Sequence, residues 1–163
     1  LILIIRGVIN MPFKVETLPE QLISGFQTTL PTPASFNDIS EMSVVKADYI
    51  SKLKDIQDQV TEDAMDDDFY AVNFNQDEKQ HYLVGVRVMA APTESFTIPA
   101  GKYAKFEFKS LDRNEIDQMI GAAYGELAQS IDYAVAGNYN LEVVTNLISG
   151  KGKFKIYLPI VAK

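Results

Sequence analysis

The stretch Ile98-Pro99-Ala100-Gly101-Lys102-Tyr103-Ala104-Lys105-Phe106-Glu107-Phe108 decides the fold, because it repeats an arrangement found earlier in the chain. A break at Pro99-Ala100-Gly101 separates a short apolar run from the strand that follows it. Near the start of the chain, Leu18-Pro19 similarly lies between two β-rich runs, 13–18 and 22–29, which we expect to form a strand pair. The echo indicates an internal duplication.

Each of these strand regions leads into a helix. In the first half, apolar residues recur with helical spacing, which predicts a helix with one packed and one charged face. These residues are Val45, Tyr49, Leu53, Ile56 and Val60. In the second half, Asp112 and Glu115 have the spacing of an N-cap residue and its N3 partner, so a helix is predicted from there to about Ser130. The apolar face of this second helix would carry Ile116, Met119, Ile120, Ala123 and Leu127.

Two more strands follow each helix. A polar turn at 75–80 joins the first two, and a Gly-containing turn at 149–152 joins the second two. The four predicted strands are 69–74, 82–88, 140–145 and 154–160. The order strand-strand-helix-strand-strand therefore occurs twice.

The predicted fold class is α+β, in which the duplicated units form a pseudo-twofold antiparallel-sheet domain with a cleft between its halves. Residues 11–163 are expected to make one domain, because Met11-Pro12-Phe13 has the character of a domain start. Residues 1–10 are interpreted as an N-terminal extension, either upstream or added sequence, outside that domain. A cleft between two halves is a common place for a small-molecule site.

Composition and charge exclude several classes of function. The chain has 163 residues, with 15 Lys plus Arg, 22 Asp plus Glu and a net charge of −7, which argues against direct nucleic-acid binding. It has no cysteine and one histidine, His81, so we expect no metal site and no cofactor. The apolar start, Leu1 to Ile5, is far shorter than the roughly 20 residues that span a bilayer. We therefore expect a cytoplasmic protein without a membrane partner.

Two motifs resemble the GyrI-like effector-binding domain family. They are the strand entry Pro99-x-Gly101-x-Tyr103-Ala104-x-Phe106 and the closing run Ile156-Tyr157-Leu158-Pro159-Ile160, and the resemblance extends from about Phe13 onward. Members of this family are duplicated α+β domains that bind small, often cationic and aromatic molecules. Some are fused to AraC-type or MerR-type DNA-binding regions and others stand alone. The resemblance implies a stand-alone effector-binding protein that takes amphipathic or aromatic organic cations in a central pocket, in transcriptional regulation or drug sequestration.

Glu142 is the position that matches the family's pocket glutamate, so the resemblance implies that it faces the bound cation. This chain departs from the family pattern at the neighbouring Leu141 and Val144. Independently of the family, strand alternation puts Glu142 on one face with Asn140 and Val144. A carboxylate buried there would need a cation. The alternative is a surface glutamate on an edge strand.

Aromatic residues in the matching motifs are the other candidates for the ligand site. Tyr103, Tyr124 and Tyr157 could form a cage, with Glu107 as a second carboxylate. Each has a plain alternative: Tyr103 and Glu107 share a strand face with Lys105 that could be a solvated outer face. Tyr124 could be ordinary core, and Tyr157 could be either pocket wall or outer surface.

Two other functions stay open at this point. The founding members of the family are proteins that restrain DNA gyrase, so the acidic surface could instead meet a protein partner, either gyrase or a regulator. Some relatives hydrolyse electrophilic toxins, and a pocket glutamate could activate water in such a reaction. We expect a binding protein with no catalytic residue, because no sequence feature demands catalysis.

Overall fold

The computed structural model describes residues 3–5, 8–31, 39–55, 61–90, 94–109, 112–145 and 152–163. Its helices are α1 (Ser40–Asp55), the single 3₁₀ turn η1 (Thr61–Asp63) and α3 (Arg113–Gln129). Its strands are β1 (Leu3–Ile5), β2 (Val8–Asn10), β3 (Lys14–Leu18), β4 (Gln21–Thr29), β5 (Phe69–Gln76), β6 (Lys79–Val88), β7 (Ser95–Ile98), β8 (Gly101–Phe108), β9 (Tyr133–Val135), β10 (Tyr139–Thr145) and β11 (Lys153–Ala162). None of the helices in these ranges is long and apolar enough to cross a membrane.

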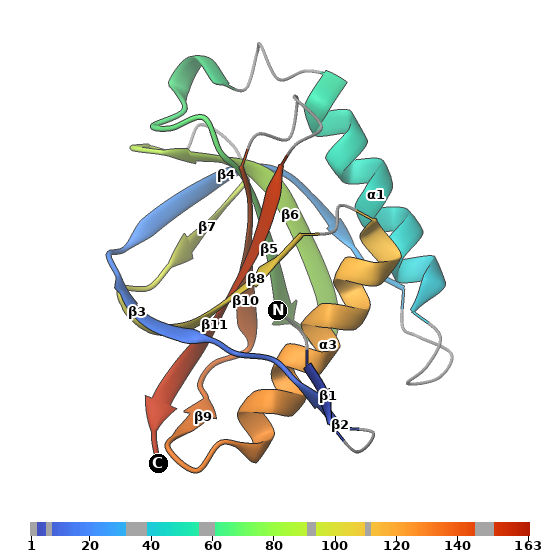
Figure 1. Cartoon of the computed structure of the whole chain (residues 1–163). Helices are drawn as coiled ribbons and strands as arrows, with labels where there is room; N and C mark the ends of the chain where they lie inside the picture. Colours follow the sequence, from blue (N-terminus) through green and yellow to red (C-terminus); the bar gives the residue numbers. More distant parts are fainter. Residues whose placement is uncertain are drawn as a thin grey trace.

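The sheet has the pseudo-twofold symmetry that the duplication predicts. Its strands follow the order β3-β8-β11-β10-β5-β6-β4-β7, all antiparallel, with β9 added beside β11. When each strand is replaced by its counterpart in the other half, the same order results, read from the opposite edge. The pseudo-twofold axis therefore lies between the central strands β5 and β10. The sheet is strongly curled, and both helices lie on one side of it (Figure 1). The predicted α+β class and the doubled order of elements are confirmed, with β9 as an addition.

One prediction about strand pairing is wrong, since β3 and β4 do not pair with each other. Instead β3 pairs with β8 of the second half, and β7 pairs with β4 of the first half. Leu18 lies opposite Gly101 and Gln21 opposite Ile98, so the two Pro-containing connections exchange partners. Proline fixes φ at about −65°, whereas a two-residue hairpin needs a positive φ at its first central residue, so a tight hairpin is disfavoured at these connections. The first strand of each half therefore pairs with a strand of the other half.

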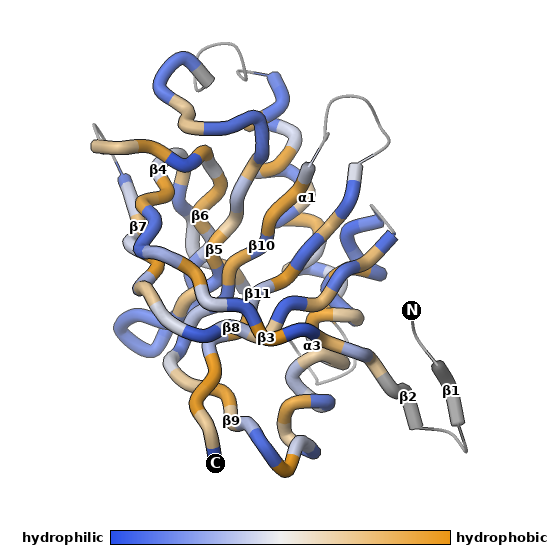
Figure 2. The backbone as a smooth tube through the Cα atoms, turned by 60° about the vertical axis from the view of Figure 1, so that its left-hand side comes forward, coloured by the Kyte–Doolittle hydropathy of each residue, from blue (hydrophilic) through white to orange (hydrophobic). Residues whose placement is uncertain are grey.

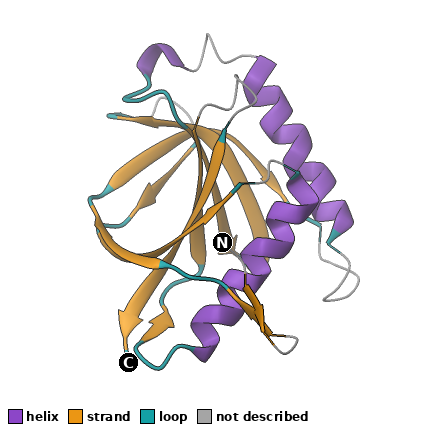
Figure 3. Cartoon of the chain, viewed as in Figure 1, coloured by secondary structure: helices purple, strands orange, loops and turns teal. Residues whose placement is uncertain are grey.

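The helices cover one face of the sheet (Figure 3). Two hydrophobic clusters lie beneath them, and a third occupies the other face. Leu53 of α1 packs with the β5–β6 side of the sheet, and Leu127 of α3 packs with the β8–β11 side. On the opposite, inner face of the curl, Val72 and Leu141 from the two central strands belong to a separate cluster. The hydropathy colouring shows apolar residues concentrated along these central strands (Figure 2).

The ends of the elements agree with the capping and turn chemistry. Asp112 caps α3, because its Oδ1 accepts a hydrogen bond of 2.9 Å from the Glu115 N–H, and the helix ends before Ser130 as predicted. The predicted turn at 75–80 is shorter than expected. Only Asp77 and Glu78 leave the strands, with φ of 54° and 62°, which makes a two-residue hairpin.

Some predicted features lie beyond the described residues. The helix α1 is described as far as Asp55, so the predicted apolar positions Ile56 and Val60 lie outside these ranges, as does the predicted turn at 149–152 apart from Gly152. At the N-terminus, β1 and β2 pair with each other as a separate two-stranded sheet. Met11 is buried in the cluster beneath α3. A domain that begins at this residue stays a prediction.

Candidate functional site: a cleft between the two helices

A cleft of about 490 Å³ lies between α1 and α3, over the central strands where the two halves meet. Helix α1 contributes Met42 and Lys46 to its walls, and α3 contributes Asp117, Gly121 and Tyr124. The sheet and the adjoining loops contribute Ile39, Asn73, Asn75, Gln80, Gly137, Asn138, Tyr139 and Asn140, and α3 also contributes Ile120. Half of the fourteen lining residues are polar or charged and the rest are apolar, glycine or tyrosine. Polar groups that converge on a partly apolar cleft are the kind that orient a small molecule.

Four charged side chains form a buried quartet at and beneath this cleft: Lys46 of α1, Arg113 and Asp117 of α3, and Glu142 of β10. Lys46 Nζ lies 3.0 Å from Asp117 Oδ1 and 3.8 Å from Glu142 Oε2. Arg113 Nη1 donates to Glu142 Oε1 at 2.6 Å, and its Nη2 pairs with Asp117. With two positive and two negative groups, the quartet has no net charge, which is how buried charges are retained.

Glu142 is held on every side by groups of the protein itself. Its side chain is 1% exposed, and it lies on the helix-covered face, where strand alternation placed it. In addition to Arg113, Asn73 Nδ2 donates to Oε2 at 2.6 Å and the Tyr82 hydroxyl donates to Oε1 at 3.3 Å. The cation that a buried carboxylate needs is therefore supplied within the chain, chiefly by Arg113.

Burial and charge shift the pKa values of the quartet and its neighbours. Burial lowers the pKa of Lys46, although the Glu142 carboxylate opposes that shift. Burial alone would raise the pKa of Asp117, but the charges of Lys46 and Arg113 outweigh it and hold that pKa below its usual value. Burial, reinforced by Glu142, raises the pKa of Tyr82 well above its usual value. Asp117 is thus ionised and Tyr82 a neutral phenol at neutral pH.

An amide relay connects the quartet to the cleft wall. Asn73 Nδ2 donates to Asn140 Oδ1 at 2.8 Å, and Asn140 Nδ2 donates to the Tyr124 hydroxyl at 3.0 Å. Both asparagines are buried and lie opposite each other on β5 and β10. Among the described residues, Asn73 Oδ1 has no hydrogen-bond partner although it is buried. It is therefore an acceptor that a ligand N–H or O–H could satisfy.

The residues predicted for the site divide between the two faces of the sheet. Glu142 and Tyr124 belong to the helix-covered face, where Tyr124 lines the cleft and Glu142 does not. Tyr103, Tyr157 and Glu107 belong to the other face. Because paired residues of neighbouring strands share a face, these last three cannot meet Glu142 across the sheet. The structure therefore brings together two of the five residues.

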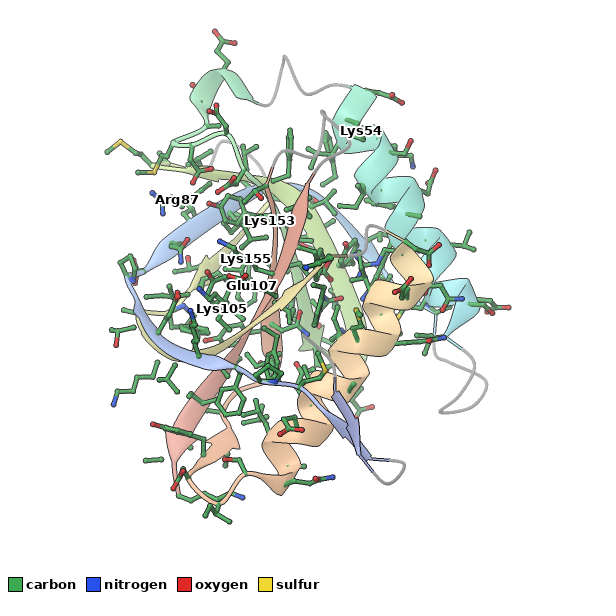
Figure 4. All side chains as sticks on the ribbon, in the orientation of Figure 1. Lys54, Arg87, Lys105, Glu107, Lys153 and Lys155 are labelled. Atoms are coloured by element: carbon green, nitrogen blue, oxygen red, sulfur yellow. The ribbon has the colours of Figure 1, made fainter. Side chains whose placement is uncertain are left out.

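Each residue on the far face has its own surroundings. Tyr103 is buried, and its hydroxyl donates to the Pro99 carbonyl at 2.5 Å and shares a hydrogen bond of 2.7 Å with Tyr139. Tyr157 lines a second cavity of about 260 Å³ inside the curl of the sheet. The half-exposed Glu107 lies 3.5 Å from Lys105, on the side of β8 away from the helices (Figure 4). Tyr103 on the same face is buried and Lys105 is mostly buried, so this face is not the solvated outer face of the alternative reading.

The sequence analysis missed both cations of the quartet, Lys46 and Arg113. It also missed the Asp117 carboxylate and the pairing of Asn73 with Asn140. The helical spacing carried a signal for Lys46, which shares the inward stripe of α1 with Met42, Ile50 and Leu53. Asp117 likewise lies between the apolar positions Ile116 and Ile120 of α3. A charged residue within an apolar stripe at helical spacing is the pattern that could have identified both.

The architecture, a curled antiparallel sheet with two helices that enclose a cleft, is that of an effector-binding domain. The family model described as Cass2, integron-associated effector binding protein, matches residues 14–160, and the chain belongs to this family. The match confirms the predicted GyrI-like membership. No curated protein sequence matches the chain.

Solved structures with this fold are similar over nearly the whole chain. A structure of SAV2435 bound to tetraphenylphosphonium has a TM-score of 0.73 and 14% identity, covering 93% of this chain and 94% of that one. A putative bacterial transcription regulation protein from Staphylococcus aureus MU50 has a TM-score of 0.69 and 16% identity, covering 93% and 99%. The integron cassette protein VCH_CASS2 from the mobile metagenome of Vibrio cholerae has a TM-score of 0.61 and 12% identity, covering 91% and 95%. At these identities the likeness shows the fold.

Proposed function

We propose that this chain binds a small amphipathic organic molecule in the cleft between α1 and α3, with aromatic organic cations as the ligand class. The observation that carries the proposal is the cleft itself, with its mixed apolar and polar lining around Asn73, whose Oδ1 is unpartnered among the described residues. Membership of an effector-binding family supports the proposal. So does the similar fold of SAV2435, which was solved with tetraphenylphosphonium, an aromatic cation.

A binding role is favoured over a catalytic one by the state of Asp117. This carboxylate faces the cleft, but Lys46 and Arg113 hold its pKa below the usual value, so it is a weak base. A general base would need the opposite shift. We therefore propose effector binding, coupled to transcriptional regulation or to drug sequestration in the cytoplasm.

Filling the cleft is expected to abolish this binding. Gly121 lies on the cleft wall, and a Cβ built there meets no atom within 4 Å, so the Gly121→Leu side chain would occupy the ligand space. We expect Gly121→Leu to weaken methyltriphenylphosphonium binding by about tenfold or more, which corresponds to about 1.4 kcal/mol, measured by isothermal titration calorimetry.

Gly125→Leu is the matched control for this experiment. Gly125 lies on the same helix with equally open space around it, but it does not line the cleft. Both substitutions favour the helix equally, so only the cleft distinguishes them. Binding that survives in both variants, or that is lost in both, would place the ligand elsewhere. Absence of binding to the wild-type chain would contradict the proposed ligand class.

A further inference from the structure

The ammonium group of Lys46 lies in surroundings that an organic cation would itself require. Two carboxylates flank it, Asp117 at 3.0 Å and Glu142 at 3.8 Å. The same nitrogen lies 5.2 Å from the ring centroid of Tyr82, within the range of a cation–π interaction. Paired carboxylates beside an aromatic face form a typical site for an ammonium ligand.

We propose that Lys46 is a tethered occupant of the cation site, and that it sets the charge selectivity of the cleft by competing with positively charged ligands. This inference rests on the proposed function and specifies which residue limits the affinity of the cleft for its cationic ligands. While Lys46 is in place, the quartet is neutral and a ligand cation meets a like charge. Once Lys46 is removed, two carboxylates face only Arg113, and the net negative charge attracts a cation.

Only one of the two buried cations is placed to act in this way. Arg113 does not line the cleft, and it is fixed by Glu142, by Asp117 and by the Phe154 ring, whose centroid lies 5.6 Å from its Cζ. Lys46 lines the cleft, and its ammonium is a point charge on a flexible four-carbon stem. Burial also lowers the pKa of Lys46, which makes the charged form easier to displace.

The experiment compares a cation with a neutral molecule of similar shape. The probes are methyltriphenylphosphonium and the uncharged triphenylphosphine oxide, titrated calorimetrically into the wild-type chain, Lys46→Met and Lys52→Met. Lys52 is the matched control, since it lies on the same helix, is largely exposed and pairs with Asp48 at the surface. We expect Lys46→Met to bind the cation about tenfold more tightly or better, with the neutral probe changed less than about twofold. Lys52→Met should leave both affinities unchanged.

The ratio of the two affinities separates charge selection from a merely structural role, because repacking would change both probes together. If the ratio of cation affinity to neutral-probe affinity is unchanged or lower in folded Lys46→Met than in the wild type, the proposal is overturned. In that case, binding of the neutral probe would still support the cleft as a ligand site. Binding of neither probe to any of the proteins overturns both the proposed function and this inference.

A measurement on the wild-type chain keeps the test valid if Lys46→Met does not fold. The groups that face Lys46 are Asp117, Glu142, Arg113 and Tyr82. Burial lowers the pKa of Lys46, so raising the pH removes its charge, while burial raises the pKa of Tyr82 and keeps that phenol neutral. Cation affinity is therefore expected to rise as the pH is raised from neutrality toward 10.5, while affinity for the neutral probe stays constant. A cation affinity that is flat or falls over this range overturns the proposal.

Discussion

Glu142→Gln is expected to lower the free energy of unfolding by about 3–5 kcal/mol, because it removes one charge from a buried, neutral quartet. Lys46 and Arg113 then share the single carboxylate of Asp117, and the site carries an uncompensated positive charge. The glutamine retains the shape of the side chain, so the loss reports charge rather than packing. Urea unfolding followed by circular dichroism measures it.

The pH dependence of this variant has a definite sign. Burial already lowers the pKa of Lys46 from 10.5, and the variant lacks the carboxylate that opposes the shift most strongly. Between that lowered pKa and 10.5, the unfolded chain binds more protons than the folded one, so stability rises with pH. We therefore expect the deficit of Glu142→Gln to be largest near neutral pH and to narrow as the pH approaches 10.5.

Glu107→Gln provides the control for both measurements. Glu107 is also a strand glutamate 3.5 Å from a lysine, but its side chain is 55% exposed. An exposed ion pair contributes at most about 1 kcal/mol, so this variant should stay close to the wild type at every pH. Equal free energies of unfolding for Glu142→Gln and Glu107→Gln would contradict the role of Glu142 in neutralising the buried charges of the quartet.

Gly85→Ala is expected to be even more destabilising, by about 4 kcal/mol or more, because two backbones approach each other too closely to admit a methyl group. Gly85 lies opposite Gly25 where β6 pairs with β4. A Cβ at Gly85 would overlap the carbonyl oxygen of Ser24, and a Cβ at Gly25 would overlap that of Val84. Neither obstacle is a flexible side chain, so the strands themselves would have to separate.

Gly125→Ala tests whether the loss of stability is specific to the close approach of β4 and β6. Its Cβ meets nothing within 4 Å on the exposed side of α3, so helix propensity alone acts and about 0.5–1 kcal/mol should be gained. Thermal and urea unfolding of the two variants should therefore move in opposite directions. A Gly85→Ala protein within about 1 kcal/mol of the wild type would be incompatible with the close approach.

The sequence was sufficient for the order of elements because local chemistry determines it. Apolar alternation, the Asp112 cap and the repeated proline breaks each act over a few residues, and they define the two similar halves. Strand pairing depends on distant partners instead. Nothing near Leu18 in the sequence indicates that its opposite residue is Gly101.

The candidate site was only partly accessible to the same reasoning. Alternation grouped Glu142 with Asn140 and Val144, because it needs only the period of one strand, but it did not indicate that the helices would cover this face. The positions of Lys46 and Arg113 depend on how two helices from different halves pack together over the seam. Lysine and arginine are usually exposed, so composition gave no reason to expect a neutralising pair there. Family motifs gave Tyr103 and Tyr157 without indicating that the sheet would separate them from Glu142.

The exchange of first strands between the halves has a consequence for the order of folding. Strand β3 can pair with β8 only after β8 has been synthesised, so β3 stays unpaired in the sheet until most of the second half is available. Pairing across such a separation requires closing a long loop before contacts compensate for the lost entropy. We therefore expect the two halves to fold as one cooperative unit, because the second half supplies β7 to pair with β4 and β10 to pair with β5.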